Sequence, residues 1–86
     1  MNEYFQIRRN IKNPIFFDRF SEIQYEGLKI LDLGCGHGAL SIDLALKGAK
    51  EIVGIDLNSE LISFANRNLK SNFPELTKKY LLRLLI

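Results

Sequence analysis

The sequence has only one cysteine, Cys35, and one histidine, His37, and it lacks tryptophan among its 86 residues. A single cysteine excludes an intrachain disulfide, which agrees with a reducing compartment. One cysteine and one histidine cannot supply the four ligands of a structural zinc site, so we expect no metal centre. The formal net charge of +2 is too small to indicate a nucleic acid or an anionic membrane as a partner.

Long apolar runs are also missing. No stretch approaches the roughly 20 consecutive apolar residues that a membrane-spanning helix needs. The N-terminus does not have the apolar core of a signal peptide, because Arg8, Arg9 and Lys12 interrupt it. With 47% hydrophobic and 26% charged residues, the composition is typical of a soluble globular domain. We therefore expect a cytoplasmic protein that is one domain or a part of one.

The hydrophobic pattern of the middle of the chain predicts an α/β fold. Residues 28–33 form a short apolar run that glycines follow at once, which is typical of a buried parallel strand, and residues 51–55 form another. Between them, residues 39–47 carry leucines at helical spacing, and a further helix, capped by Asn58 or Ser59, follows the second strand. Strand, helix and strand in this order predict a parallel βαβ unit.

The two ends of the chain are less regular. Asn13 and Pro14 fit the start of a helix, and the aromatic residues after them recur at helical spacing, so we expect a helix over residues 13–27. The tail, residues 73–86, fits either a helix with an apolar face or a third strand. The pattern therefore divides one domain into this helix, a core over residues 28–72 and a divergent tail.

A glycine-rich loop between the first strand and its helix is the most informative stretch. It runs from Asp32 to Gly38 with glycines at every second position from Gly34. Glycines there let the chain turn sharply and let a ligand approach the backbone. The helix that follows directs free N–H groups and the positive end of its dipole at that ligand. Asp56 closes the second strand 22 residues after Gly34, close to the roughly 20 expected for a ribose-binding carboxylate.

These features leave the identity of the nucleotide-like cofactor open. Gly34, Gly36 and Ala39 satisfy the dinucleotide pattern, so an NAD- or FAD-binding fragment is one candidate. Asp32 argues against it, because a carboxylate at the mouth of the site would repel a pyrophosphate and favour a cationic ligand. S-adenosylmethionine carries a sulfonium and an ammonium and has no phosphate. A third candidate is a non-catalytic remnant that acts as an interaction module.

Two motifs carry a resemblance to a known family. Residues 30–38 (ILDLGCGHG) resemble the first motif of the class I S-adenosylmethionine-dependent methyltransferases, D-x-G-x-G-x-G after an apolar strand. Residues 53–57 (VGIDL) resemble the motif at the end of their second strand. The resemblance implies an incomplete Rossmann-like parallel sheet with flanking helices, and S-adenosylmethionine as the cofactor. The aromatic helix before the first strand resembles the segment that often covers the cofactor in this family.

The resemblance also implies a role for each motif residue. The three loop glycines would line the methionine end of the cofactor, and Asp32 would organise its amino group. Asp56 would hold both ribose hydroxyls, and Leu57 would flank the adenine. The implied cofactor-binding residues, with Cys35 as a small residue lining the loop, are Asp32, Gly34, Cys35, Gly36, Gly38, Asp56 and Leu57.

The chain departs from the family after this point. The family's sheet has about seven strands, and its fourth strand and the loop after it face the methyl acceptor. The tail does not resemble the family's third strand and its acidic loop, so we expect a partial domain over residues 1–86 that is inactive alone and whose methyl acceptor is unidentified. We also expect the strand over residues 28–33 to have an unpaired edge, which favours self-association.

Three remaining side chains could suggest chemistry. Cys35 has no second cysteine, and His37 lies two residues away on a tight loop, so neither is expected to be a nucleophile or a general base. Asp43 on the first core helix is expected to be a solvated surface residue. We therefore assign no catalytic residue.

Overall fold

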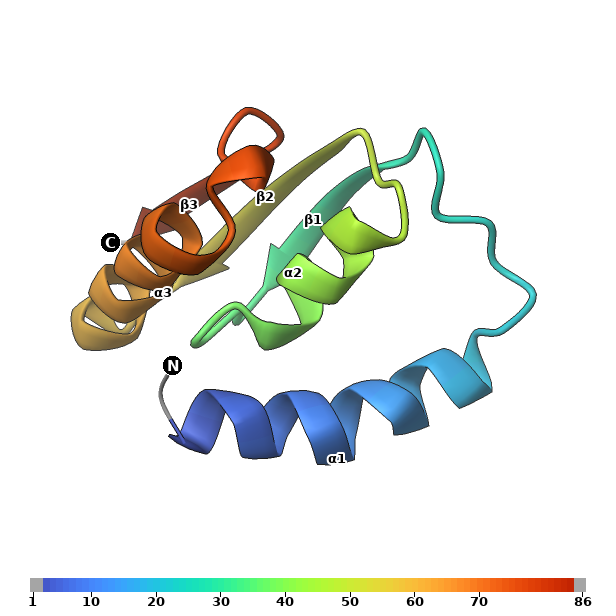
Figure 1. Ribbon diagram of the computed structural model, residues 1–86, viewed down its shortest axis with the longest axis horizontal. Helices are drawn as coiled ribbons and strands as arrows, with labels where there is room; N and C mark the ends of the chain where they lie inside the picture. Colours follow the sequence, from blue (N-terminus) through green and yellow to red (C-terminus); the bar gives the residue numbers. More distant parts are fainter. Residues whose placement is uncertain (1–2, 85–86) are drawn as a thin grey trace.

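The computed structural model describes residues 3–84 and contains one three-stranded parallel sheet (Figure 1). The strands follow the order β1-β2-β3, the same order as in the sequence. Strand β1 pairs with β2 from Lys29↔Glu51 to Leu33↔Ile55, which confirms the parallel βαβ unit. The bounds of the strands are β1 Lys29–Leu33, β2 Glu51–Asp56 and β3 Tyr80–Leu84.

The helices lie on one face of this sheet. Figure 1 shows α2 and α3 in front of the strands, with α1 running along α2 at the lower side. A 3-10 turn, η1, leads from α3 into β3. The bounds of the helical elements are α1 Glu3–Arg19, α2 Ala39–Leu46, α3 Ser59–Asn72 and η1 Pro74–Leu76. The parallel sheet and the alternation of strands and helices along the chain confirm an incomplete Rossmann-like α/β fold.

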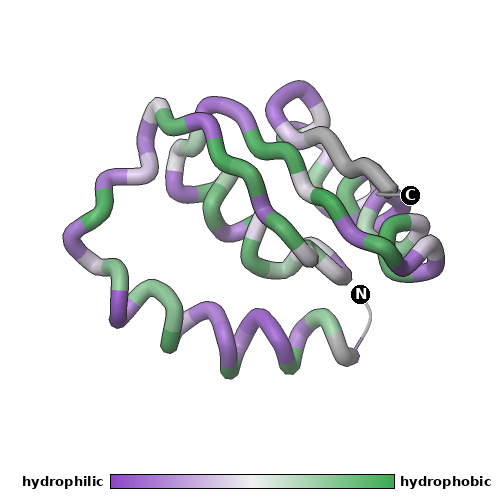
Figure 2. Tube along the Cα trace, turned by 180° about the vertical axis from the view of Figure 1, so that it is seen from behind, coloured by the Kyte–Doolittle hydropathy of each residue, from purple (hydrophilic) through white to green (hydrophobic). Residues whose placement is uncertain are grey.

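The core lies between the sheet and these helices. Ile42 of α2 and Ile52 of β2 are almost completely buried there, and Leu69 of α3 packs into the same cluster. On the opposite face Leu31 and Leu33 are 58% and 70% exposed. Figure 2, which views the molecule from behind, shows hydrophobic residues along β1 and β2 with no helix over them. The sheet is therefore covered on one face only in the described residues.

The first helix begins ten residues earlier than expected. Residues 3–19 form α1, so Asn13 lies inside the helix instead of capping it, and Pro14 is also an interior residue. An interior proline costs about 3 kcal/mol, because it removes one N–H donor and its ring crowds the preceding turn. The expectation of a helix over residues 13–27 was wrong because α1 contacts α2 partly through polar side chains, which an apolar periodicity does not detect.

The tail forms a third strand. Strand β3 pairs in parallel with β2, from Ile52↔Tyr80 to Asp56↔Leu84, on the side away from β1. Of the two structures expected for the tail, a third strand is therefore confirmed for residues 80–84 and a helix is not, and Leu85 and Ile86 lie outside the described residues. The pairing is non-local, which is why the apolar run by itself was ambiguous. Within the described part of the chain, no helix combines the length and apolarity needed to cross a membrane.

Candidate functional site

The glycine-rich loop lies at the carboxyl ends of β1 and β2, where open parallel sheets bind their ligands. The N–H groups of Gly34 and Cys35 both donate to the Ile55 carbonyl, at 2.7 and 3.0 Å. The loop closes on itself where the Gly38 N–H donates to the Cys35 carbonyl at 2.9 Å. Gly38 has a φ of +84° and is the residue before α2, a conformation that glycine adopts without a steric cost.

The Asp56 carboxylate joins this loop to the start of α3. One oxygen, Oδ2, accepts from the Gly36 N–H at 2.8 Å, and the other, Oδ1, accepts from the Asn58 N–H at 2.8 Å. Asn58 in turn caps α3, because its side-chain oxygen accepts from the N–H groups of Glu60 and Leu61. The carboxylate therefore holds two turns together and keeps lone pairs for a ligand.

A cavity of about 200 Å³ adjoins the loop and Asp56. Four of the residues expected to bind a cofactor line it, namely Gly34, Cys35, Gly36 and Asp56. Arg8, Asn13 and Leu61 line it as well, and sequence reasoning missed them. Arg8 and Asn13 come from α1, far from the motif in the sequence, and only the packing of α1 beside the loop brings them here. No sequence signal marks them.

Asp32 and Gly38 do not line this cavity, and Gly38 is buried while Asp32 is half-buried. Oδ2 of Asp32 accepts a hydrogen bond from the Ser41 hydroxyl of α2, while Oδ1 has no partner within residues 3–84. Burial raises the pKa of Asp32, the Ser41 hydrogen bond opposes the rise, and the Asp56 charge adds to it. Neither Asp32 nor Asp56 belongs to an ion pair among the described residues. Arg8 lines the cavity and brings a positive charge to it, and within residues 3–84 it pairs with neither carboxylate.

Leu57 lies apart from the cavity. It is 75% exposed and, with Leu33 and Ile55, lines a separate hollow on the uncovered face of the sheet. Gly34 and Asp56 border both hollows. The hollow that Leu57 lines therefore adjoins the cavity, and these two residues separate them.

The environments of Cys35 and His37 favour the uncharged forms of both side chains. Burial raises the pKa of the Cys35 thiol to about 12, and the nearby Asp32 and Asp56 charges contribute. A thiol with this pKa is protonated at neutral pH and is a poor nucleophile. Burial lowers the pKa of His37, with a further contribution from the Arg8 charge, and the ring packs edge-on against Phe64 at 4.9 Å between centroids.

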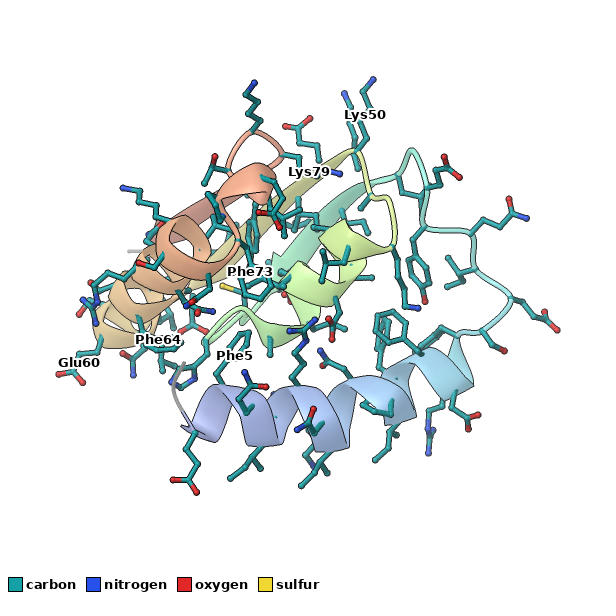
Figure 3. All side chains as sticks on the ribbon, in the orientation of Figure 1. Phe5, Lys50, Glu60, Phe64, Phe73 and Lys79 are labelled. Carbon is teal, nitrogen blue, oxygen red and sulfur yellow. The ribbon has the colours of Figure 1, made fainter. Side chains whose placement is uncertain are left out.

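Polar contacts fasten α1 beside the site. The Arg9 guanidinium pairs with the Asp43 carboxylate of α2 at 2.6 Å, and Asn13 donates to Asp43 at 2.7 Å and to the Ala39 carbonyl at 3.0 Å. The expectation that Asp43 is a solvated surface residue was therefore wrong. At the other end of α1, Phe5 points into the space between the helices, toward Phe64 and Phe73 (Figure 3).

Comparisons with known proteins point to one family. The profile of the family described as "Methyltransferase domain" matches residues 24–79. The chain is 52% identical over 46 residues to YqeM of Bacillus subtilis, covering 54% of this chain and 18% of that protein. It is 43% identical over 49 residues to the ribosomal protein L11 methyltransferase of Pseudomonas putida, covering 57% of this chain and 17% of that one.

Among solved structures, the magnesium protoporphyrin IX methyltransferase ChlM of Synechocystis PCC 6803 with bound SAH superposes with a TM-score of 0.72. At 22% identity, with 92% of this chain and 35% of that chain covered, this likeness concerns the fold. The chain thus spans less than a fifth of these curated relatives and about a third of this structure.

Proposed function

We propose a role for this chain from one premise: it belongs to the methyltransferase domain family, whose class I members use S-adenosylmethionine as cofactor. The proposed role is that of the cofactor-binding portion of a methyltransferase, with the cofactor seated against the glycine-rich loop. Bound there, S-adenosylmethionine supplies a methyl group on a sulfonium for transfer to a nucleophile. We expect the methyl acceptor to bind to other parts of such an enzyme, because the chain spans only 17–18% of the relatives named above.

The observation that carries this proposal is the pair of carboxylates at the loop. Asp32 and Asp56 are close enough for the Asp56 charge to raise the pKa of Asp32, and no cation pairs with either among the described residues. The Asp32 carboxylate attracts a cationic ligand and repels a pyrophosphate, whereas Asp56 suits the ribose of either kind of cofactor. The ammonium and sulfonium of S-adenosylmethionine fit this charge pattern, and NAD and FAD do not.

The remaining donors and acceptors also fit the cofactor. In the proposal, Asp56 accepts from the ribose hydroxyls with the lone pairs that Gly36 and Asn58 leave free. The backbone of Gly34, Cys35 and Gly36 lines the cavity beside the methionine end, with Gly38 and Asp32 behind it. Leu57 flanks the adenine from the neighbouring hollow. Arg8, which lines the cavity and carries a positive charge, is suited to the cofactor's carboxylate.

A comparison of two ligands tests this assignment. Calorimetric titration of the chain with S-adenosylhomocysteine should give saturable binding, and titration with NAD under the same conditions should give none. Tighter binding of NAD would replace this proposal with the dinucleotide alternative. Absence of binding by both ligands, with no rise in the melting temperature, would favour a non-catalytic interaction module.

We further propose that the isolated chain binds cofactor in the cytoplasm without transferring its methyl group. Methyl transfer is a direct displacement, so catalysis depends chiefly on aligning the acceptor against the sulfonium. In the proposal, the residues that line the cavity contact the cofactor, and none of them holds a methyl acceptor. Tritium from labelled S-adenosylmethionine should therefore not appear in candidate acceptors incubated with the chain.

Self-association is the last part of the proposal. The outer edge of β1 has no neighbour in the described sheet, because β3 pairs with β2 on the other side. The exposed side chains of Leu31 and Leu33 make that region of the sheet apolar, and an unpaired apolar edge invites pairing with another chain. Light scattering should detect oligomers at micromolar concentration, and replacing Leu33 with lysine should reduce them. A monodisperse monomer would contradict this part.

A further inference from the structure

A buried hydroxyl lies beneath the glycine-rich loop. Tyr80, the first residue of β3, is only 5% exposed, and its Oη has no hydrogen-bond partner among the described residues. The same oxygen lies 3.0 Å from the position that a Cβ on Gly38 would occupy, so the phenol reaches under the start of α2. A buried hydroxyl without a partner costs free energy, and such groups call for an explanation.

Ser41 lies between this phenol and the Asp32 carboxylate. It is fully buried in the first turn of α2, and its hydroxyl donates to Oδ2 of Asp32. A hydroxyl that donates its one proton still has lone pairs with which to accept. The Tyr80 hydroxyl lies beside Gly38, and Ser41 follows Gly38 by three residues at the start of α2, so both hydroxyls lie on the same side of this helix. Burial raises the pKa of Tyr80, and the Ser41 hydroxyl opposes that rise.

We propose that Tyr80, Ser41 and Asp32 form a buried relay in which Tyr80 donates to Ser41 and Ser41 donates to the Asp32 carboxylate. The relay occupies Oδ2 of Asp32 and leaves Oδ1 for the ammonium of the bound cofactor. Ser41 and Tyr80 are therefore positioning residues: they touch no ligand, and they hold the carboxylate ionised and correctly oriented. This inference rests on the proposed function, because it presumes a cationic group at Asp32.

The charges around Asp32 explain why a donor is needed there. Asp56 at the end of β2 raises the pKa of Asp32, and burial raises it further. Cys35 in the loop and Tyr80 on β3 are the other titratable groups that face this cluster, and burial keeps both protonated at neutral pH. The Ser41 hydrogen bond is the one contribution that lowers the pKa of Asp32 in this set. Without Ser41, the carboxylate should protonate at a higher pH and lose its attraction for a cation.

Two measurements on the whole chain test the relay. Carboxyl-carbon NMR gives the pKa of Asp32 without ligand, and calorimetry gives the affinity for S-adenosylhomocysteine as a function of pH. Because the folded pKa of Asp32 lies above its ordinary value, affinity should fall as the pH drops through that pKa. In Ser41→Ala both midpoints should move to higher pH, and affinity should fall most between the wild-type and variant midpoints, because at such a pH Asp32 is ionised in the wild type and protonated in the variant.

Tyr80→Phe separates positioning from packing. It keeps the buried ring and removes the proposed donor to Ser41, so the Asp32 midpoint should rise by less than in Ser41→Ala. The melting temperature should change little, because the desolvation cost of the buried hydroxyl is lost together with its hydrogen bond. Ser41→Thr should restore the wild-type midpoint. Ser63→Ala, on the exposed side of α3, is the matched control and should change nothing.

The outcomes are distinguishable. An Asp32 pKa that stays the same in Ser41→Ala and Tyr80→Phe as in Ser63→Ala would overturn the relay. A wild-type chain that does not bind S-adenosylhomocysteine would contradict the proposed function, and the NMR titration would still decide whether Ser41 and Tyr80 control the Asp32 carboxylate. An Asp32 pKa in Tyr80→Phe equal to that in Ser63→Ala would refute the place of the phenol in the relay, whatever the melting temperature of the variant.

Discussion

Replacing Asp56 with asparagine removes one negative charge from the site and keeps the size of the side chain. In the wild type the two carboxylate oxygens accept the Gly36 and Asn58 N–H groups, each at 2.8 Å. An asparagine has only one acceptor oxygen, so one of these two donors loses its partner. A hydrogen bond to a charged group contributes about 1.5–3 kcal/mol. Because Asp56 is partly exposed, we expect the free energy of unfolding to decrease by an amount near the lower end of this range.

The same substitution should weaken cofactor binding. The ribose hydroxyls are proposed to donate to the Asp56 carboxylate, and a neutral amide replaces charge-assisted hydrogen bonds with weaker ones. A loss of about 1.5–3 kcal/mol corresponds to a roughly 10- to 150-fold rise in Kd, because each 1.4 kcal/mol is a factor of ten. Calorimetric titration with S-adenosylhomocysteine measures this rise directly.

Asn58→Ala is the matched control for this experiment. It removes the acceptor that caps α3, which receives the N–H groups of Glu60 and Leu61 at 3.0 and 3.1 Å, and leaves the Asp56 carboxylate in place. Loss of such a cap costs about 1 kcal/mol of stability. Both variants should therefore melt at lower temperature, and only Asp56→Asn should bind more weakly. Wild-type affinity in Asp56→Asn, or an equal loss in Asn58→Ala, would refute the reasoning.

Two further predictions concern the packing around the site. Gly38→Ala should lower the melting temperature, because a Cβ at a φ of +84° is strained by about 1–2 kcal/mol and would also come within 3.0 Å of the Tyr80 hydroxyl. Gly34→Ala, where nothing lies within 4 Å of the added carbon, should cost less, and equal losses would show that the contact with Tyr80 is unimportant. A double-mutant cycle of Arg9→Met and Asp43→Asn should give a coupling energy of about 1 kcal/mol or less for this partly exposed pair. A coupling of zero would mean that the ion pair does not help to hold α1 on α2.

The central part of the fold could be predicted from the sequence because its signals are local. The strand over residues 28–33 was expected one residue longer than β1, and the helix expected over residues 39–47 ends at Leu46. Asn58 was one of two expected caps, and its side-chain hydrogen bonds identify it as the cap of α3. Apolar runs, helix-terminating glycines and capping residues act over a few neighbouring residues, so they can be recognised in the sequence alone.

The two ends of the chain were decided by contacts between distant residues. Helix α1 extends back to Glu3, and its contacts with α2 include Arg9 and Asn13, whose partner Asp43 lies 30 or more residues away. Polar residues in such contacts look like solvent-exposed residues in a periodicity analysis. Strand β3 is a strand because Tyr80 pairs beside Ile52, which no local pattern specifies.

The candidate site divides in the same way. The sequence by itself determined the motif, because strand, glycine turn and helix are contiguous, and it determined the acidic residue that ends the next strand. Only the tertiary structure decided that Arg8 and Asn13 line the cavity, that Asp32 turns inward to Ser41, and that Tyr80 lies beneath Gly38. The physical reason is that backbone conformation follows from neighbouring residues, whereas the direction and partner of a side chain depend on which elements pack against it.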